Sequence, residues 1–185
     1  MNIKPLLIIA ILIAAGYYAI AVKHFNPFAK TIEDDLPFRK FDEEIVSMKD
    51  IQGENGTIIV RLSTWCPHCI EQLHNLYPIT EPLQEFKINV VAIVGGPDKE
   101  TIKNWSEENM MPWSWKRVYW HDGLTEGLKI TKEVTPYVIF RDRNKKLFLY
   151  KAGLMPLNEI IENINKMLAT YEEYKDFDKP EPHPL

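Results

Sequence analysis

Two cysteines, the only ones in the chain, lie three positions apart where a strand pattern gives way to a helix pattern. The strand pattern is the run TIIVRL at residues 57–62, and the segment Trp65-Cys66-Pro67-His68-Cys69 follows it after a short turn. Beyond Cys69 the spacing of apolar residues is that of a helix. This arrangement predicts a reactive dithiol at the start of a helix.

The residues around Cys66 favour its thiolate form. We expect Cys66 at the N-cap and Pro67 at the first helical position, where a fixed φ is useful and a missing N–H costs nothing. The sulfur then faces unpaired backbone N–H groups and the positive end of the helix dipole. Cys66 is therefore the expected nucleophile, and Cys69, one turn further on, is the residue expected to resolve a mixed disulfide.

His68 lies between the two cysteines and can donate a hydrogen bond or a positive charge to the Cys66 thiolate, which would lower the pKa of Cys66. Each tenfold gain in thiolate at neutral pH stabilises the reduced form by about 1.4 kcal/mol. The same gain raises the reduction potential of the dithiol by about 30 mV. A dithiol tuned in this way tends to give its disulfide away.

The segment resembles the thioredoxin superfamily through its W-C-x-x-C motif after a buried strand, and the sequence Cys66-Pro67-His68-Cys69 is similar to that of DsbA-type disulfide oxidants. A second matching element is Thr135-Pro136, followed by a strand pattern. The resemblance implies that Pro136 is a cis-proline facing the dithiol and that Trp65, Thr135 and Pro136 bind an extended substrate. It implies protein thiols and disulfides as substrates, with no cofactor.

One position departs from the thioredoxin pattern. Thioredoxins usually carry a buried acid six residues before the first cysteine, and this chain has Val60 there, followed by Arg61. Proton transfer from the resolving thiol would then depend on water or on another group. We interpret Arg61 as a paired arginine at the strand end rather than as part of the site.

The predicted fold class is α/β, a thioredoxin fold with a central mixed sheet flanked by helices, over residues 41–168. The apolar pattern predicts a buried parallel strand at residues 88–94. It also predicts a hairpin formed by residues 137–141 and 147–151, and an amphipathic helix over residues 157–168. A helix and a strand between about 97 and 120 form an insertion that resembles the TlpA/ResA-like branch, which is membrane-associated and extracytoplasmic. We expect the Met and Trp side chains of residues 110–115 to cover the core.

The N-terminal segment, residues 1–22, has the pattern of a signal peptide or a membrane anchor, with Lys4 before an apolar run over 6–22. Cleavage after Ala21 and retention as an inner-membrane tether both remain open. Either one places the dithiol outside the cytoplasm, in a bacterial periplasm by analogy with the family. Residues 23–40 read as a linker and residues 169–185 as a polar tail.

Three other classes of function compete with redox catalysis. The net charge of −4, with signs interspersed, argues against binding to nucleic acid. Cys66, His68, Cys69 and His74 provide metal donors, but structural zinc sites draw their ligand pairs from separate segments, so we predict no metal site. A docking module would need neither the cysteines nor Thr135-Pro136.

The sequence therefore predicts an extracytoplasmic thiol–disulfide oxidoreductase. Cys66 and Cys69 are the catalytic residues, and Pro67 and His68 tune the thiolate. The tuning favours disulfide donation, and the alternative is thiol reduction of the TlpA/ResA type, acting in cytochrome c maturation or on other exported proteins. A membrane redox partner would recycle the dithiol.

Overall fold

The computed structural model describes residues 34–119, 124, 127–128 and 134–170. The expected signal or anchor segment, residues 1–22, lies outside this part of the chain, as do most of the expected linker and tail. Among the described residues, no helix combines the length and the apolar character that crossing a membrane requires.

Five strands form one mixed sheet in the order β5-β4-β3-β6-β7. The strands are β3 (Gly56–Ser63), β4 (Ile88–Gly95), β5 (Lys116–Tyr119), β6 (Tyr137–Asp142) and β7 (Leu147–Ala152). Strands β3, β4 and β5 run parallel, and β6 is antiparallel to both β3 and β7. The predicted parallel strand at 88–94 and the predicted hairpin are confirmed. Because β3 is the middle strand, the dithiol that follows it lies at the centre of the end of the sheet where β3 finishes.

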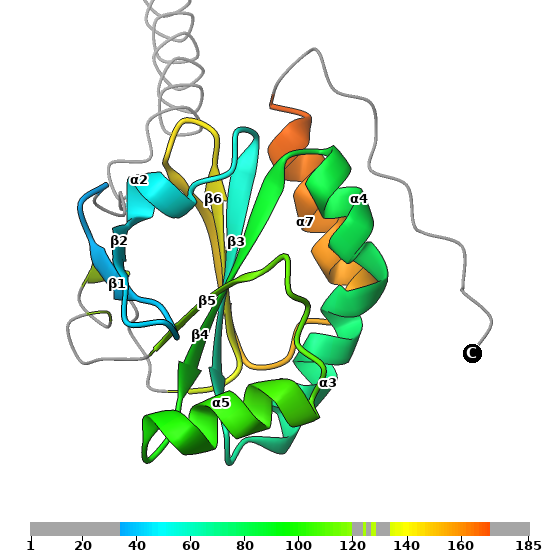
Figure 1. The fold of residues 1–185 in the computed structure, drawn as a ribbon. Coiled ribbons are helices and arrows are strands. Elements are labelled where there is room, and N and C mark those ends of the chain that lie inside the picture. The colour runs from blue at the N-terminus through cyan, green and yellow to red at the C-terminus, as the bar shows by residue number, and fades with distance from the viewer. Residues whose placement is uncertain (1–33, 120–123, 125–126, 129–133, 171–185) are drawn as a thin grey trace, which may run out of the picture.

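Both faces of the sheet are covered (Figure 1). On one side lie α3 (Pro67–Leu76), the 3₁₀ helix η1 (Tyr77–Ile79), α4 (Thr80–Glu85), α5 (Lys99–Glu108) and α7 (Leu157–Leu168). On the other side lie α2 (Met48–Ile51) and a small hairpin of β1 (Pro37–Arg39) and β2 (Ile45–Ser47). This is the layered arrangement that the sequence predicted for a thioredoxin fold.

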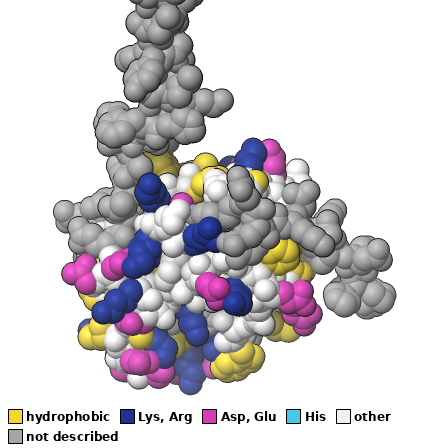
Figure 2. All heavy atoms as spheres, turned by 90° about the horizontal axis from the view of Figure 1, so that it is seen from above, with side chains coloured by type: hydrophobic (Ala, Val, Ile, Leu, Met, Phe, Trp, Pro, Cys, Tyr) yellow, Lys and Arg dark blue, Asp and Glu magenta, His cyan; other side chains and the backbone are white. Residues whose placement is uncertain are grey.

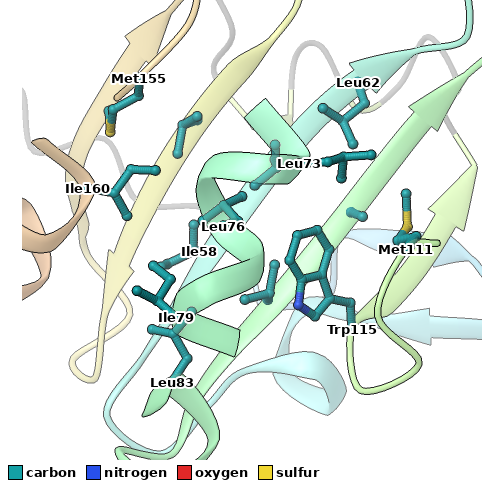
Figure 3. Close-up of a cluster of buried hydrophobic side chains, with 14 of the residues drawn as sticks. Ile58, Leu62, Leu73, Leu76, Ile79, Leu83, Met111, Trp115, Met155 and Ile160 are labelled. Carbon is teal, nitrogen blue, oxygen red and sulfur yellow. The ribbon is translucent and has the colours of Figure 1, made fainter. Parts of the chain in front are cut away.

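The alternation of side chains along β3 divides the core into two clusters. Ile58 and Leu62 point toward α3 and pack with Leu73 and Leu76, as Figure 3 shows, while Ile59 belongs to the cluster on the opposite face. All five side chains are fully buried. Burial on both faces explains why β3 reads as a nearly continuous apolar run.

The expected insertion, about 97–120, forms a crossover that extends the sheet. Asp98 caps α5 by accepting a hydrogen bond from the backbone N–H of Thr101 at 2.8 Å, and β5 then pairs parallel to β4 as an edge strand. The Met and Trp side chains that follow α5 do not all cover the core. Met111 and Trp115 are buried, whereas Met110 is 76% exposed and Trp113 is 82% exposed.

The C-terminal end of the expected linker, residues 34–40, packs against the sheet. Phe38 in β1 is fully buried, and Asp34 makes an ion pair with the fully buried Arg141 of β6 at 2.6 Å. Arg141 also donates to the side chain of Gln52. The folded unit therefore begins before residue 41, because an apolar side chain and a buried guanidinium both find partners there.

Basic and acidic side chains are interspersed on the face that Figure 2 shows. The same mixing is seen in exposed ion pairs such as Lys87–Glu54 at 2.7 Å and Lys145–Asp34 at 2.5 Å. Exposed pairs of this kind contribute little stability each, about 0–1 kcal/mol. The network around the buried Arg141 is the exception, because a buried charge needs its partners.

The ionisation of Asp34 should make the free energy of unfolding depend on pH. Hydrogen bonds from Lys145 and then from Arg141 hold the pKa of Asp34 below its ordinary value of 3.8. Its stabilising effect is therefore complete above that value and is lost as the pH falls through the lower folded value. In urea unfolding, Asp34→Asn should destabilise the protein at pH 7, and its effect should shrink as the pH is lowered below that ordinary value. The neighbouring, exposed Asp35→Asn is the control, and a loss for Asp34→Asn that does not shrink at low pH would contradict the assignment.

Candidate functional site

Helix α3 begins at the dithiol, as the sequence predicted. Cys66 is the N-cap, in extended conformation (φ −102°, ψ 107°), and Pro67 occupies the first turn. The chain reaches this point through a tight turn in which the Cys66 N–H donates to the carbonyl of Ser63 at 3.1 Å. The Cys69 N–H in turn donates to the Cys66 carbonyl at 3.0 Å. The Cys66 sulfur therefore lies at the positive end of the α3 dipole.

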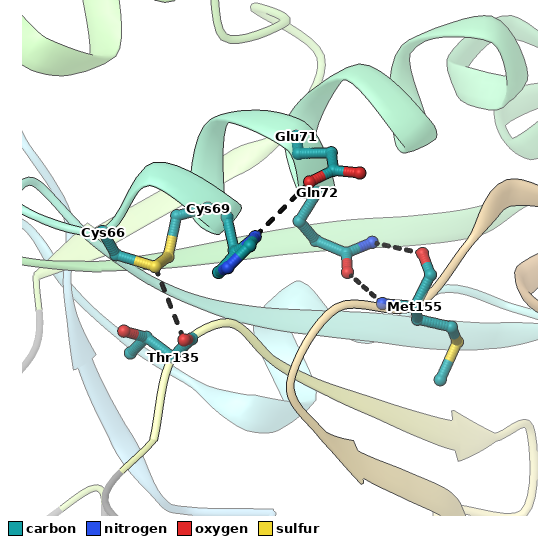
Figure 4. Close-up of a disulfide and its surroundings, with 7 residues drawn as sticks. Cys66, Cys69, Glu71, Gln72, Thr135 and Met155 are labelled. Atoms are coloured by element: carbon teal, nitrogen blue, oxygen red, sulfur yellow. Dashed lines mark hydrogen bonds and ion pairs between the residues drawn. A yellow bond between two sulfur atoms is a disulfide. The ribbon is translucent and has the colours of Figure 1, made fainter.

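Cys66 and Cys69 form a disulfide, with their Cα atoms 5.3 Å apart (Figure 4). The two residues differ in exposure, since Cys69 is fully buried in the core cluster and Cys66 is partly exposed. Of the two residues, only Cys66 is therefore accessible to a reagent in solution.

The Thr135–Pro136 segment lies directly across from the dithiol. Its peptide bond is cis, and the carbonyl oxygen of Thr135 is 3.4 Å from the Cys66 sulfur (Figure 4). The two segments meet because β6, which starts at Tyr137, pairs with β3 so that Tyr137 lies opposite Arg61. The carbonyl can accept a hydrogen bond from a reduced Cys66 thiol, and its partial negative charge disfavours a thiolate.

Trp65 and His68 flank the cysteines on the exposed surface. The Trp65 side chain is 68% exposed and forms one wall of an open groove of about 600 Å³, with α5 on the other side. The His68 ring is 72% exposed, and its Nδ1 atom lies 3.4 Å from a carboxylate oxygen of Glu71. The polar contact of His68 is therefore with Glu71 and not with the Cys66 sulfur in this oxidised state.

Gln72 is a site residue that the sequence reasoning missed. It is fully buried on α3, one turn after Cys69, and it exchanges two hydrogen bonds with the backbone of Met155. The available signal was a lone amide on the otherwise apolar face formed by Cys69, Leu73 and Leu76. A buried amide needs partners, but the sequence does not say which residue supplies them.

The structure also places the other residues considered from the sequence. Val60 is fully buried in the core, and Arg61 lies within β3, two residues before its end, and is partly buried. His74 packs edge-on against Tyr77, with ring centroids 5.5 Å apart. Within the described ranges, no three His, Cys, Asp or Glu side chains are grouped so as to hold a metal ion.

Comparison with other proteins gives matches at the level of structure. No family model and no curated protein sequence matches this chain. A thioredoxin-like protein from Aeropyrum pernix is 21% identical, with a TM-score of 0.60 over 83% of this chain and 97% of that one. A secreted thiol-disulfide isomerase from Corynebacterium glutamicum is 15% identical, with a TM-score of 0.65 over 73% of this chain and 84% of that one.

A DsbF homologue from Corynebacterium diphtheriae is also similar, at 15% identity and a TM-score of 0.66 over 77% of this chain and 89% of that one. At these identities the similarity concerns the fold. Together with the sheet order and the position of the cysteine pair, it shows that this chain has the fold of the thioredoxin-like proteins.

Proposed function

We propose that this protein is a thiol–disulfide oxidoreductase that exchanges disulfides with protein substrates through Cys66 and Cys69. The observation that carries the proposal is the asymmetry of the pair. Cys66 is partly exposed at a helix N-terminus, its partner Cys69 is fully buried, and the Thr135 carbonyl oxygen lies 3.4 Å from the Cys66 sulfur. A purely structural disulfide needs none of these features.

Disulfide donation would proceed in two exchanges. A substrate thiolate attacks the Cys66 sulfur, the bond between the cysteines breaks, and its electron pair leaves on Cys69, which then takes up a proton. A second substrate thiolate attacks the substrate sulfur of the mixed disulfide, and Cys66 leaves as a thiolate. The substrate gains a disulfide and the protein is left as a dithiol. Reduction of a substrate is the reverse sequence.

The substrate chain would lie across the edge of the sheet. Thr135 and Pro136 would hold it in extended form beside the Cys66 sulfur, and the exposed indole of Trp65 would contact the flanking residues. Pro67 fixes the first turn of α3 and so keeps the backbone N–H groups directed at the sulfur.

We infer that disulfide donation is the main direction. The helix N-terminus stabilises a Cys66 thiolate, and His68 does so when its imidazole turns toward the sulfur. Two contacts favour the second candidate, thiol reduction: the Thr135 carbonyl opposes a thiolate, and Glu71 attracts the His68 ring away from the sulfur. Both directions use the same residues.

We further propose that the dithiol works outside the cytoplasm, in a bacterial periplasm. The apolar run at 6–22 supports export, with retention as an inner-membrane tether or cleavage after Ala21. The similar protein from Corynebacterium glutamicum is a secreted one. A membrane redox partner would then restore the oxidation state of the dithiol after each turnover.

Substitution of the buried cysteine should trap substrates. In Cys69→Ser the mixed disulfide through Cys66 cannot be resolved within the protein, so covalent complexes should accumulate. These complexes should appear on non-reducing gels with a reduced and oxidised model substrate, and they should disappear with dithiothreitol. Cys66→Ser is the matched control and should trap far less, because its remaining thiol is buried. Equal trapping by both variants would contradict the assigned roles.

Alkylation should distinguish the two thiols of the reduced protein. The partly exposed Cys66 should react with iodoacetamide at least about tenfold faster than the buried Cys69, because only the exposed thiolate meets the reagent. Mass spectrometry of the modified peptides measures both rates. Similar rates for the two cysteines would remove the basis for naming Cys66 the nucleophile.

His68→Ala tests the tuning role of the imidazole. If His68 stabilises the thiolate from its exposed position, its loss should cost about 0.3–1 kcal/mol of that stabilisation and slow Cys66 alkylation below neutral pH. Glu71→Gln should act in the opposite direction, because the ring loses its competing carboxylate. The alkylation rate as a function of pH measures both changes, and an unchanged rate in His68→Ala would exclude a tuning role.

A further inference from the structure

Gln72 places a side-chain amide in the apolar core beside the dithiol. It lies on α3 three residues after Cys69, and both residues are fully buried. Burying an amide without partners is costly, so its hydrogen bonds show what it is fixed to.

Both polar atoms of the Gln72 side-chain amide bind the backbone of one residue, Met155. Its Nε2 group donates to the carbonyl of Met155 at 3.2 Å, and its Oε1 atom accepts from the N–H of Met155 at 2.8 Å (Figure 4). Asn75 adds a donor to the same carbonyl at 3.1 Å. Met155, itself fully buried, lies in the loop between β7 and α7, so these bonds tie that loop to the dithiol helix.

The same loop is hydrogen-bonded to the cis-proline segment. Gly153 donates its backbone N–H to the carbonyl of Pro136 at 2.8 Å. Its φ of +92° is a conformation that side chains rarely adopt, so glycine suits this position. The carbonyl of Thr135, next to Pro136, then contacts the Cys66 sulfur. The contacts thus form a closed circuit from α3 through the Met155 loop to Thr135 and back to α3.

We propose that Gln72 is a positioning residue for the dithiol, which holds the Thr135 carbonyl against the Cys66 sulfur through the Met155 loop. The proposal rests on the function proposed above, because it concerns the reactivity of the same sulfur. Gln72 touches neither the substrate nor the reacting bond. It sets the distance between two groups that belong to different parts of the chain.

The position of the carbonyl affects the two redox states differently. In the reduced protein the Cys66 thiol can donate a hydrogen bond to the Thr135 oxygen, which stabilises the thiol and opposes the thiolate. A carbonyl that is free to move away loses this effect. Release of the Met155 loop should therefore lower the pKa of Cys66 and raise the reduction potential of the pair.

Three variants separate the two bonds of Gln72 from that of Asn75. Gln72→Leu has similar size and leaves the Met155 N–H without its acceptor. Asn75→Ala removes a donor that Gln72 duplicates, so it is the matched control. The double variant removes both donors to the Met155 carbonyl. His68, Glu71 and the Lys151–Glu159 pair between β7 and α7 are unchanged in all three, so a change in these contacts does not account for an effect.

The experiment measures the alkylation rate of Cys66 against pH in each reduced variant, and the potential against glutathione. A fall of about half a unit in the pKa of Cys66 gives roughly threefold faster alkylation in mildly acidic buffer. We expect this change in Gln72→Leu, a change at least as large in the double variant, and none in Asn75→Ala. Unchanged rates and potentials in a folded Gln72→Leu would overturn the proposal.

Amide hydrogen exchange in the unmodified protein gives a second test that does not depend on a variant folding. The N–H groups of Met155 and Gly153 should be protected in both redox states, and rapid exchange at either one would contradict the circuit. Neither the alkylation rate nor the amide exchange requires disulfide exchange with a substrate. If the protein failed to exchange disulfides with any substrate, the proposed function would fail while these readouts would still report on Gln72.

Discussion

Helix α3 begins immediately after the central strand of the sheet, with Cys66 as its N-cap and Pro67 in its first turn. This start point places a sulfur where backbone N–H groups are unpaired and the helix dipole is positive. It also buries Cys69 one turn later, whereas Cys66 stays partly exposed. The register of β6 against β3 then brings the Thr135 carbonyl to the same sulfur. The reactivity proposed for the protein depends on this meeting of a helix end and a carbonyl.

The parts of the fold that could be predicted from the sequence are those with strong local signals. The apolar run of β3, the proline after Cys66 and the spacing of apolar residues in α7 each indicate an element without knowledge of its neighbours. The prediction that Thr135–Pro136 faces the dithiol depended on the resemblance to thioredoxin-like proteins. The structure brings these segments together although they are far apart in the chain.

The features that could not be predicted from the sequence depend on tertiary contacts. Gln72 is an ordinary polar residue in a helix pattern until Met155 is placed beside it. Phe38 reads as part of a linker because β1 is only three residues long, too short to show a period. Likewise Met111 and its neighbour Met110 are identical in type, yet one is buried and the other exposed. Only the turn after α5 decides between them.

The reduction potential of the Cys66–Cys69 pair is the most direct measure of the central claim, that this disulfide is a reversible redox couple and not a structural link. Equilibration of the purified protein with glutathione, read by mass spectrometry after alkylation, gives the value. We expect a potential above that of thioredoxin, which is about −270 mV. A disulfide that stays oxidised below about −300 mV, as structural disulfides do, would contradict it.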